Sequence, residues 1–328
     1  MTSIDIVIPT RNRGDMIRAT LESLQQSTAQ NFQVWVVDQS TNEQTAVVVK
    51  QIAAHDSRFS LISTQSKGVN IARNIGILAG RAPIVALTDD DCIITKTWLE
   101  TLLDDYEKNP QVDSIFGRVL PGVPDDAAGE STEQKRLQQV LPMARKDDPE
   151  YQLFMGNRFN LGFGHGANMS FRRNAFAQYG LFDEYLGAGA PLRSWPERDM
   201  GYRILAKNGR ILYSPNALII HNHWREWAEV KRTYHNYAIG TGAAIGKYIR
   251  SNDYGSCVML FEWIVDQGVR QVASGILKWR SWQKCYVGLQ QIVLPWVGFI
   301  LSLKYEVDPT QMVYVNKPQR SSGKVQPV

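Results

Sequence analysis

The chain has 328 residues, 44% apolar and 21% charged, which suits one large soluble domain or two smaller ones, each with its own core. The net charge of +4 is uneven, because residues 225–328 hold 13 Lys and Arg against 7 Asp and Glu, while the rest of the chain is slightly acidic. This excess is too weak for nucleic-acid binding, but it suits an anionic membrane surface or an anionic substrate.

The first 120 residues are predicted to alternate strands and helices. Their patterns predict strands at 4–9, 32–37, 59–63 and 83–87, with helices at 15–26, 43–54 and 68–79 between them. Such alternation predicts a Rossmann-like α/β fold with a mostly parallel sheet and helices on both faces. Because crossovers are right-handed, the C-terminal ends of the strands should share one edge, where ligands of such folds bind.

The loop after the fourth predicted strand holds three consecutive carboxylates, Asp89, Asp90 and Asp91. Thr95 is expected to cap a following helix at about 96–108. Adjacent carboxylates repel one another unless a cation offsets them, and oxygen ligands at a strand end suit Mg²⁺ or Mn²⁺ shared with phosphates. A solvated acidic turn is the alternative for this triplet taken alone.

Residues 114–224 are predicted to complete the sheet. We expect a strand at 114–119, a long loop or insertion at 121–156, a Gly-rich turn into a strand at 167–171, a helix at 198–208, and short strands at 210–214 and 218–221. The glycines of the turn lack the spacing of a dinucleotide-binding loop. The sequence also lacks the P-loop, zinc-protease and α/β-hydrolase motifs, so it does not support those enzyme classes.

The last third of the chain has a different character. Residues 225–315 are predicted to form a helical C-terminal extension and 316–328 a disordered tail. The apolar run 292–303 is predicted to be too short to span a bilayer, and to form either a core helix or an interfacial anchor. Six tryptophans after residue 223 and the basic balance keep peripheral membrane contact open. Three scattered cysteines and an N-terminus without a signal peptide predict a cytoplasmic protein. A position at the inner face of the membrane stays open.

Seven short motifs follow one another in a recognisable order. They are Ile8-Pro9-Thr10-Arg11-Asn12-Arg13, Val36-Val37-Asp38-Gln39-Ser40, Gly68-x-x-x-Ala72-Arg73-Asn74-x-Gly76, Thr88-Asp89-Asp90-Asp91, Gly166-Ala167-Asn168-Met169-Ser170-Phe171, Glu197-x-Asp199-Met200-Gly201-Tyr202-Arg203 and His221. With them the chain resembles family 2 glycosyltransferases of the GT-A fold over residues 3–224. The resemblance implies that residues 1–120 bind a nucleotide sugar and residues 121–224 an acceptor.

The resemblance implies a donor site built from the strand ends. Asp38 would accept a hydrogen bond from the imide N–H of uracil, which favours a UDP-sugar, although a simple turn Asp is the structural alternative. Basic side chains would neutralise the diphosphate. The residues implied for nucleotide-sugar binding are Pro9, Thr10, Arg11, Asp38, Lys67, Arg73, Asp89 and Asp90.

The same resemblance implies that Asp89, Asp91 and His221 hold a divalent cation, Mg²⁺ or Mn²⁺. Asp91 would bind the metal, Asp89 the ribose or the metal, and Asp90 would support them. His223, two residues further on, is an alternative to His221.

Glu197 stands where family members usually have the Asp that acts as general base. A Glu is one methylene longer, but it can equally take a proton from an acceptor hydroxyl. His165, Asn168 and Asp199 are the residues predicted to contact the acceptor, with a first-turn helix acid as the structural alternative for Asp199.

The resemblance therefore implies a metal-dependent inverting glycosyltransferase that acts on a hydroxyl of a glycan or a lipid-linked acceptor. Two alternatives stay open: a non-catalytic nucleotide-sugar-binding protein and a sugar nucleotidyltransferase, although the latter class usually has a Gly-rich first loop. The sequence leaves the sugar, the nucleotide, the acceptor, the linkage and the oligomeric state undetermined.

Overall fold

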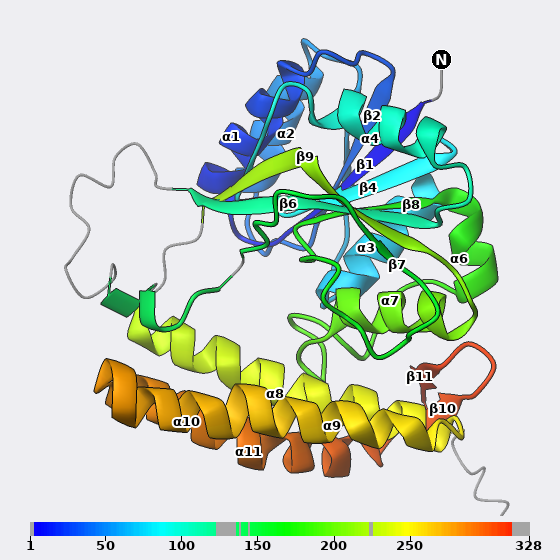
Figure 1. Ribbon diagram of the computed structural model, residues 1–328. Coiled ribbons are helices and arrows are strands. Elements are labelled where there is room, and N and C mark those ends of the chain that lie inside the picture. The colour runs from blue at the N-terminus through cyan, green and yellow to red at the C-terminus, as the bar shows by residue number, and fades with distance from the viewer. Residues whose placement is uncertain (1–2, 123–135, 138, 144, 223–225, 317–328) are drawn as a thin grey trace, which may run out of the picture.

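The computed structural model describes residues 3–122, 136–137, 139–143, 145–222 and 226–316 (Figure 1). An α/β body lies on a layer of long C-terminal helices, and the two are connected at residues 223–225, which are not described. Residues 317–328 of the predicted tail and 123–135 of the predicted loop also lie outside the described residues.

The body contains nine strands and six helices among the residues described. The strands are β1 (Ile4–Thr10), β2 (Phe32–Asp38), β3 (Phe59–Ser63), β4 (Ile84–Thr88), β5 (Cys92–Ile94), β6 (Ser114–Gly122), β7 (Gln152–Phe154), β8 (Asn168–Arg172) and β9 (Ile211–Asn222). The helices are α1 (Gly14–Gln25), α2 (Gln44–Ala53), α3 (Val69–Ala79), α4 (Trp98–Lys108), α6 (Arg173–Tyr179) and α7 (Pro196–Ala206).

The strands form one sheet in the order β3-β2-β1-β4-β8-β6-β9-β5, with β7 also paired to β9. Strands β1 to β4 are parallel, and β8 runs antiparallel between β4 and β6. The C-terminal ends of β1, β2 and β4 therefore lie at one edge, where Thr10 pairs in register with Asp38. The predicted α/β fold with a mostly parallel sheet is confirmed.

Apolar side chains cover both faces of this sheet. Ile4, Ile6 and Ile8 of β1 belong to a cluster with α1, α2 and α4, while Val7 belongs to a cluster on the other face with α3, α6 and α7. A strand that is buried on both faces reads as a continuous apolar run, as β1 does. The two clusters hold the sheet rigid, so the loops at its edge start from fixed positions.

Two local predictions were wrong. Because β5 pairs with β9 directly after the acidic triplet, α4 begins only at Trp98, and the hydroxyl of Thr95 donates to the carbonyl of Leu218 at 2.8 Å instead of capping a helix. The predicted strands at 210–214 and 218–221 are one strand, β9, whose pairing with β6 shifts register between Gly117 and Arg118.

The C-terminal layer consists of α8 (Trp227–Arg250), α9 (Cys257–Trp263), α10 (Arg270–Ser274) and α11 (Trp282–Ser302), followed by the hairpin of β10 (Glu306–Asp308) and β11 (Val313–Val315). A short 3₁₀ turn (Tyr254–Ser256) precedes α9. Two π-helical segments (Ile264–Val269 and Gly275–Trp279) flank α10, so residues 257–279 form one irregular helix.

The apolar run at 292–303 was predicted to be too short to span a bilayer. This prediction was wrong about the length of the helix, because the run is part of the longer helix α11. Helix α11 has 21 residues and, by length and composition alone, is long and apolar enough to cross a membrane. One side of it packs closely on α8: a Cβ atom on Gly242 would lie 1.7 Å from the carbonyl oxygen of Pro295, and one on Gly298 would lie 1.9 Å from that of Ile239. Only glycine allows the two helices to approach this far.

Candidate active site

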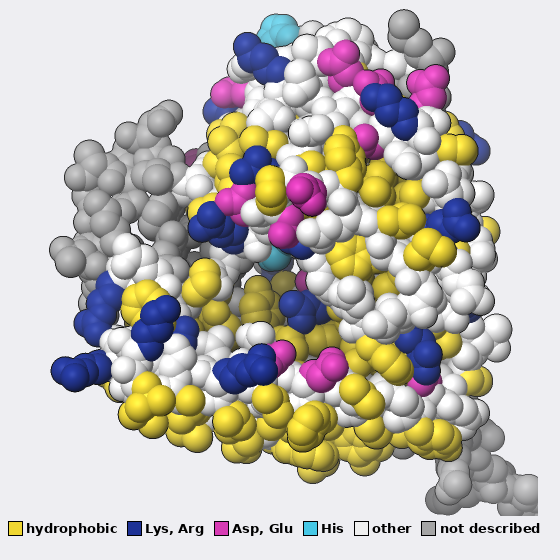
Figure 2. Space-filling model, viewed as in Figure 1, with side chains coloured by type: hydrophobic (Ala, Val, Ile, Leu, Met, Phe, Trp, Pro, Cys, Tyr) yellow, Lys and Arg dark blue, Asp and Glu magenta, His cyan; other side chains and the backbone are white. Residues whose placement is uncertain are grey.

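A cavity of about 430 Å³ opens at the edge of the sheet where β1 and β4 end. Figure 2 shows this face of the molecule hollowed between the α/β body and the helical layer. The residues of the predicted site that line the cavity are Pro9, Thr10, Arg11, Arg73, Asp89, Asp90, Asp91, His165, Glu197 and His221. Segments separated by more than 200 residues thus converge on one cavity.

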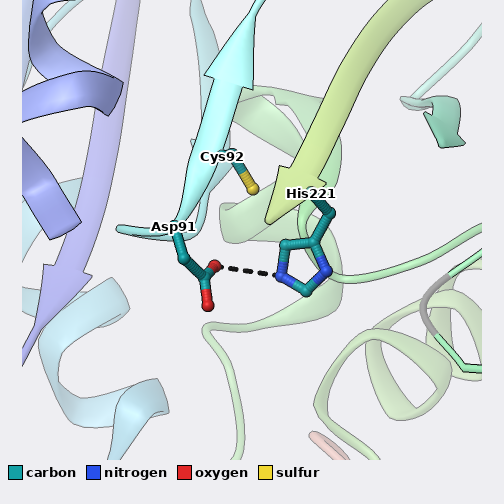
Figure 3. A group of neighbouring side chains, drawn as sticks. All are labelled: Asp91, Cys92 and His221. Atoms are coloured by element: carbon teal, nitrogen blue, oxygen red, sulfur yellow. Dashed lines mark ion pairs between the residues drawn. The ribbon is translucent and has the colours of Figure 1, made fainter. Parts of the chain in front are cut away.

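The acidic triplet meets His221 at the end of β9. The imidazole Nε2 lies 3.0 Å from Oδ1 of Asp91 (Figure 3). It also lies 3.9 Å from Oδ2 of Asp89. Two carboxylates and an imidazole are a donor set that suits Mn²⁺ or Mg²⁺ with open positions for phosphate oxygens. Asp91 and His221 are therefore close enough to share one ion, and Asp89 lies beside the same imidazole.

Cys92 is the third member of the compact group around Asp91 and His221 (Figure 3). Its thiol is fully buried, and burial, followed by the nearby Asp89 and Asp91, raises its pKa well above the usual value. Metals bind the thiolate and not the thiol. Hard cations such as Mg²⁺ and Mn²⁺ prefer the oxygen and nitrogen donors of Asp91 and His221 to this sulfur.

Arg13 forms ion pairs with Asp90 and Asp91. Its Nη1 lies 2.8 Å from Oδ1 of Asp90 and 3.1 Å from Oδ2 of Asp91. Burial opposes the charge of Arg13, but the two carboxylates outweigh it and raise the guanidinium pKa. Burial also raises the pKa of Asp90 to about 6, although Arg13 counteracts part of the shift. Asp90 is thus held by the protein, whereas Asp89 remains 28% exposed to the cavity.

Arg73 reaches the cavity from α3 with a side chain that is 4% exposed. Its Nη2 lies 3.4 Å from Oδ1 of Asp89, its Nη1 donates to Oδ1 of Asn70 at 3.3 Å, and its guanidinium lies over the ring of Phe182. A buried arginine with a fixed orientation can offer two parallel donors to a phosphate group. Its position beside Asp89 suits the diphosphate of a donor.

Glu197 lies in the first turn of α7. Pro196 occupies the first helical position, where its missing N–H costs nothing, and Trp195 before it has φ +82°. A Cβ atom on Gly166 would lie 3.2 Å from Oε2 of Glu197, so a glycine there leaves room for the carboxylate. The strained turn at Trp195 therefore aims the first acid of the helix at the Gly-rich turn before β8.

His165 lies between Glu197 and His221. Its ring centroid is 5.9 Å from that of His221, and its Nδ1 accepts a hydrogen bond from the amide of Ala167 at 3.2 Å. Burial lowers the pKa of His165, and the charge of Glu197 counteracts this only in part. A neutral imidazole with Nδ1 as acceptor carries its proton on Nε2.

A second cavity of about 550 Å³ shares Glu197, His165 and Tyr237 with the first. Its wall continues along Trp195 and Arg198 to the helical layer, and on the other side along residues 142–143 and 145–148. The guanidinium of Arg198 lies over the rings of both Trp195 and Trp263. Glu197 is therefore at the boundary of two adjoining cavities.

Two residues predicted to contact the acceptor lie elsewhere. Asp199 is buried and is bound by Lys247 at 2.6 Å, Arg203 at 3.1 Å and the hydroxyl of Tyr248 at 3.0 Å. Asn168 is also buried, where its amide donates to two backbone carbonyls and accepts from the indole of Trp98. Neither is among the residues that line these two cavities, because the polar atoms of both are bound to other parts of the protein.

Two residues predicted to bind the nucleotide are not among those that line the first cavity. Asp38 is buried and accepts a hydrogen bond from the amide of Ser40 at 2.9 Å, while its neighbour Gln39 lines the cavity. Lys67 is exposed, and Gly68 beside it lines the cavity instead. His223, the alternative metal ligand, lies outside the described residues.

The sequence-based prediction missed several residues of the site. Arg13 stands in the first motif, so its spacing from Arg11 was the available signal. The loop before α7 and helix α8 carry no motif, and their contribution is visible only in the folded chain. The additional residues that line the first cavity include Arg13, Gln39, Arg193, Ser194, Thr233, Asn236 and Tyr237.

A mostly parallel sheet whose acidic loop faces a histidine and a carboxylate across a nucleotide-sized cavity defines a glycosyltransferase of the GT-A fold. Residues 5–180 match the family model described as Glycosyl transferase family 2. This match covers more than half of the chain, and the protein belongs to that family.

Named relatives come from archaea and bacteria. A glucosyl-dolichyl phosphate glucuronosyltransferase of Haloferax volcanii is 25% identical over 232 residues, which are 67% of this chain and 68% of that one. A pre-mycofactocin glycosyltransferase of Mycobacterium tuberculosis is 27% identical over 244 residues, 70% of this chain but 46% of that one. Both names describe glycosyltransferases.

A solved structure shows the same fold over most of the chain. It is the mannosyltransferase PcManGT from Pyrobaculum calidifontis in complex with GDP-Man and Mn²⁺, with a TM-score of 0.58 and 15% identity. The match covers 90% of this chain and 86% of that one.

Proposed function

We propose that the protein transfers a sugar from a nucleoside diphosphate sugar to a hydroxyl group of a glycan or lipid-linked acceptor, with inversion at the anomeric carbon. The observation that carries this proposal is the position of Glu197 between two cavities, one of which contains the acidic triplet and His221. All three cysteines are free, which suits the cytoplasm, the location that we propose.

The donor would occupy the first cavity, with its diphosphate between Arg73 and the acidic triplet. A divalent cation held by Asp89, Asp91 and His221 would offset the charge that develops on the departing nucleoside diphosphate. Arg73 would bind a phosphate oxygen from the other side, since its guanidinium is buried and already oriented.

The nucleotide base would lie beyond Pro9, Thr10 and Arg11, towards the end of β2. A carboxylate at Asp38 suits the imide of a uracil, so we favour a UDP-sugar. The Ser40 amide donates to Oδ1 of Asp38, so Oδ2 could accept the base N–H without displacing Ser40.

The acceptor would enter the second cavity. The indole Nε1 of Trp195 is buried there and has no hydrogen-bond partner among the described residues, although buried N–H groups normally have one. An acceptor oxygen would satisfy it, and Arg198 would attract a phosphate on the same acceptor. The name of the Haloferax relative, which acts on a glucosyl-dolichyl phosphate, supports a lipid-linked acceptor.

Glu197 would take the proton of the acceptor hydroxyl as that oxygen attacks the anomeric carbon. The C–O bond to the acceptor forms while the bond to the diphosphate breaks, and the proton remains on Glu197 until solvent removes it. A single displacement from the face opposite the leaving group inverts the configuration. His165 would orient Glu197 or the acceptor through its Nε2 proton.

The test is a donor screen that measures nucleoside diphosphate release with Mn²⁺ or Mg²⁺ and a glycan or lipid-linked acceptor. We expect release with one donor, and expect Glu197→Gln to lower turnover at least about 100-fold while donor affinity stays within about twofold. Gln keeps the size of the side chain but cannot take the proton. Undiminished turnover in this variant would reject the base assignment.

The same assay separates the alternatives. A non-catalytic binding protein would bind a donor but would release no nucleoside diphosphate, whichever acceptor is present. A sugar nucleotidyltransferase would release or consume pyrophosphate instead.

A further inference from the structure

The side of α11 that faces away from α8 is apolar throughout. Seven residues of α11 are exposed, and all seven are large apolar side chains: Trp282, Tyr286, Leu289, Val293, Trp296, Val297 and Ile300. They recur every three or four residues and so form one stripe along the helix. A surface helix of a soluble domain normally carries charged and polar residues on that side.

A second apolar row runs along the irregular helix at 257–279. Its exposed members are Val258, Phe261, Val269, Ile276 and Leu277, with exposed fractions of 50–82%. Figure 2 shows hydrophobic side chains gathered along the lower edge of the molecule, over the helices that Figure 1 labels α9, α10 and α11. We call the stripe on α11 and this second row together the outer face.

The two rows belong to one continuous surface because their helices touch. A Cβ atom on Gly268 would lie 2.6 Å from Ile292, and one on Gly275 would lie 2.7 Å from the sulfur of Cys285. Such a close approach leaves no groove between the rows. A contiguous apolar surface of this extent marks an interaction site, whereas single exposed apolar residues are ordinary.

Basic residues accompany the outer face. Residues 257–304 hold five Lys and Arg against two Asp and Glu, and one of those acids, Asp266, is neutralised by an ion pair with Arg270. Lys278 and Arg280 are exposed next to Trp282, at the turn between the two rows. Figure 2 shows Lys and Arg side chains, together with some Asp and Glu, directly above the apolar edge. An apolar face bordered by cations and tryptophan complements an anionic lipid surface.

Helix α11 cannot cross a bilayer while it is packed as it is in this structure. Gln291 is buried on its inner side, where its amide donates to the carbonyl of Tyr234 at 3.0 Å and its carbonyl accepts from the indole of Trp263 at 3.2 Å. The glycine contact with α8 fixes the same side. The helix is therefore oriented with one side in protein and the other free for lipid.

We propose that the outer face docks on an anionic lipid bilayer, with α11 and the helix at 257–279 lying in the plane of the membrane. The apolar side chains enter the boundary of the acyl chains, and Lys278 and Arg280 meet the headgroups. The protein is then a peripheral enzyme that rests on its C-terminal layer, with the α/β body facing the aqueous side.

This orientation has a consequence for the acceptor, which rests on the proposed function. The second cavity is lined by Trp263 and Gln267, and the same helix carries Phe261 and Val269 on the outer face. The thickness of one helix therefore separates the acceptor cavity from the membrane surface. An acceptor anchored by a lipid could reach Glu197 without leaving the bilayer.

The test is flotation of the full chain with vesicles of neutral phosphatidylcholine alone or with 30% anionic phosphatidylglycerol. We expect binding to the anionic vesicles, and about fivefold weaker binding for each charge removed in Lys278→Gln and Arg280→Gln. Leu277→Glu and Ile300→Glu should each weaken binding at least about tenfold. Leu78→Glu is the matched control, because Leu78 is 70% exposed but lies on α3 of the body, and it should bind like the original chain.

Nucleoside diphosphate release with a soluble acceptor should be unchanged in all these variants, so failure of docking and failure of the proposed function are distinguishable. Absence of binding to either kind of vesicle would overturn the proposal. So would unchanged binding in Leu277→Glu and Ile300→Glu. A dimer that these two changes convert to a monomer, without any vesicle binding, would assign the outer face to a second copy of the chain instead.

Discussion

Asp90 and Asp91 are neighbours in the chain, but their carboxylates have different surroundings. Asp90 is buried against Arg13 and is held within the protein. Asp91 shares Arg13 but also faces His221 at 3.0 Å, and so it belongs to the group that can hold a cation. At the scale of single residues, the triplet therefore divides into one acid that pairs with Arg13 alone and two that lie close to His221.

We expect Asp91→Asn to abolish metal-dependent transfer, with a loss in kcat/KM of about 100-fold or more, because a neutral amide is a weak ligand for a hard cation. Asp90→Asn should lose about tenfold, since it leaves the cation ligands in place and removes only the partner of Arg13. Initial rates over a Mn²⁺ titration measure both. Greater damage from Asp90→Asn would show that the roles of the two acids are reversed.

At the scale of elements, α7 is connected to the C-terminal layer through a buried charge network. Lys247 of α8 lies 2.6 Å from Asp199 of α7 and 2.6 Å from Asp183, and Arg203 also binds Asp199. The side chains of all four residues are at most 1% exposed. Helix α7 carries Glu197 two residues before Asp199, so the network also fixes the position of the proposed base.

Lys247→Met should destabilise the fold by about 3–5 kcal/mol, because it leaves the buried carboxylate of Asp183 without a cation, while Asp199 keeps Arg203. Urea unfolding followed by circular dichroism measures the loss. Adding Asp183→Asn to Lys247→Met is the matched control, since Asp199 then still has Arg203 and no unpaired charge remains. The double variant should recover roughly half of the loss. A double variant less stable than the single one would contradict this account of the network.

The sheet edge and the buried network differ in how far they could be predicted from the sequence. The strands and the acidic loop were predictable because apolar runs and strand ends are local features, and parallel topology brings their ends together. Asp199 was predicted to contact the acceptor. In the structure its carboxylate binds Lys247, which lies 48 residues later in the chain. Burial of a polar side chain by distant partners leaves no local signal.

The C-terminal layer shows a second limit of the sequence. A core helix and an interfacial helix have similar composition, and the apolar run at 292–303 could not distinguish them. In the structure, the glycine contact with α8 determines which side of α11 is inside, and the remaining apolar side stays exposed. The orientation of a helix that is apolar around most of its circumference depends on its neighbours.

At the scale of the whole molecule, the first cavity is bounded by elements from the first strand to α8. Pro9 comes from β1, Glu197 from α7 and Tyr237 from the C-terminal layer, and all three line the same space. A ligand in this cavity therefore contacts both parts of the structure at once. Binding should stabilise the molecule as one unit, because the unfolded chain has no such site.

We expect the correct nucleoside diphosphate sugar together with Mn²⁺ to raise the melting temperature by roughly 5 °C when the donor is present at about 100 times its Kd. Mass action at that ratio stabilises the folded state by about 2.7 kcal/mol, and each kcal/mol shifts a chain of this size by about 2 °C. Differential scanning fluorimetry measures the shift.

Donor or Mn²⁺ alone should give a much smaller shift in melting temperature, because the diphosphate and the carboxylates each need the cation between them. Asp91→Asn should remove the joint effect, while Glu197→Gln should keep it, since Glu197 is proposed to act on the acceptor. A shift from donor alone that equals the joint one would show that the diphosphate binds through Arg73 and Arg13 without a metal.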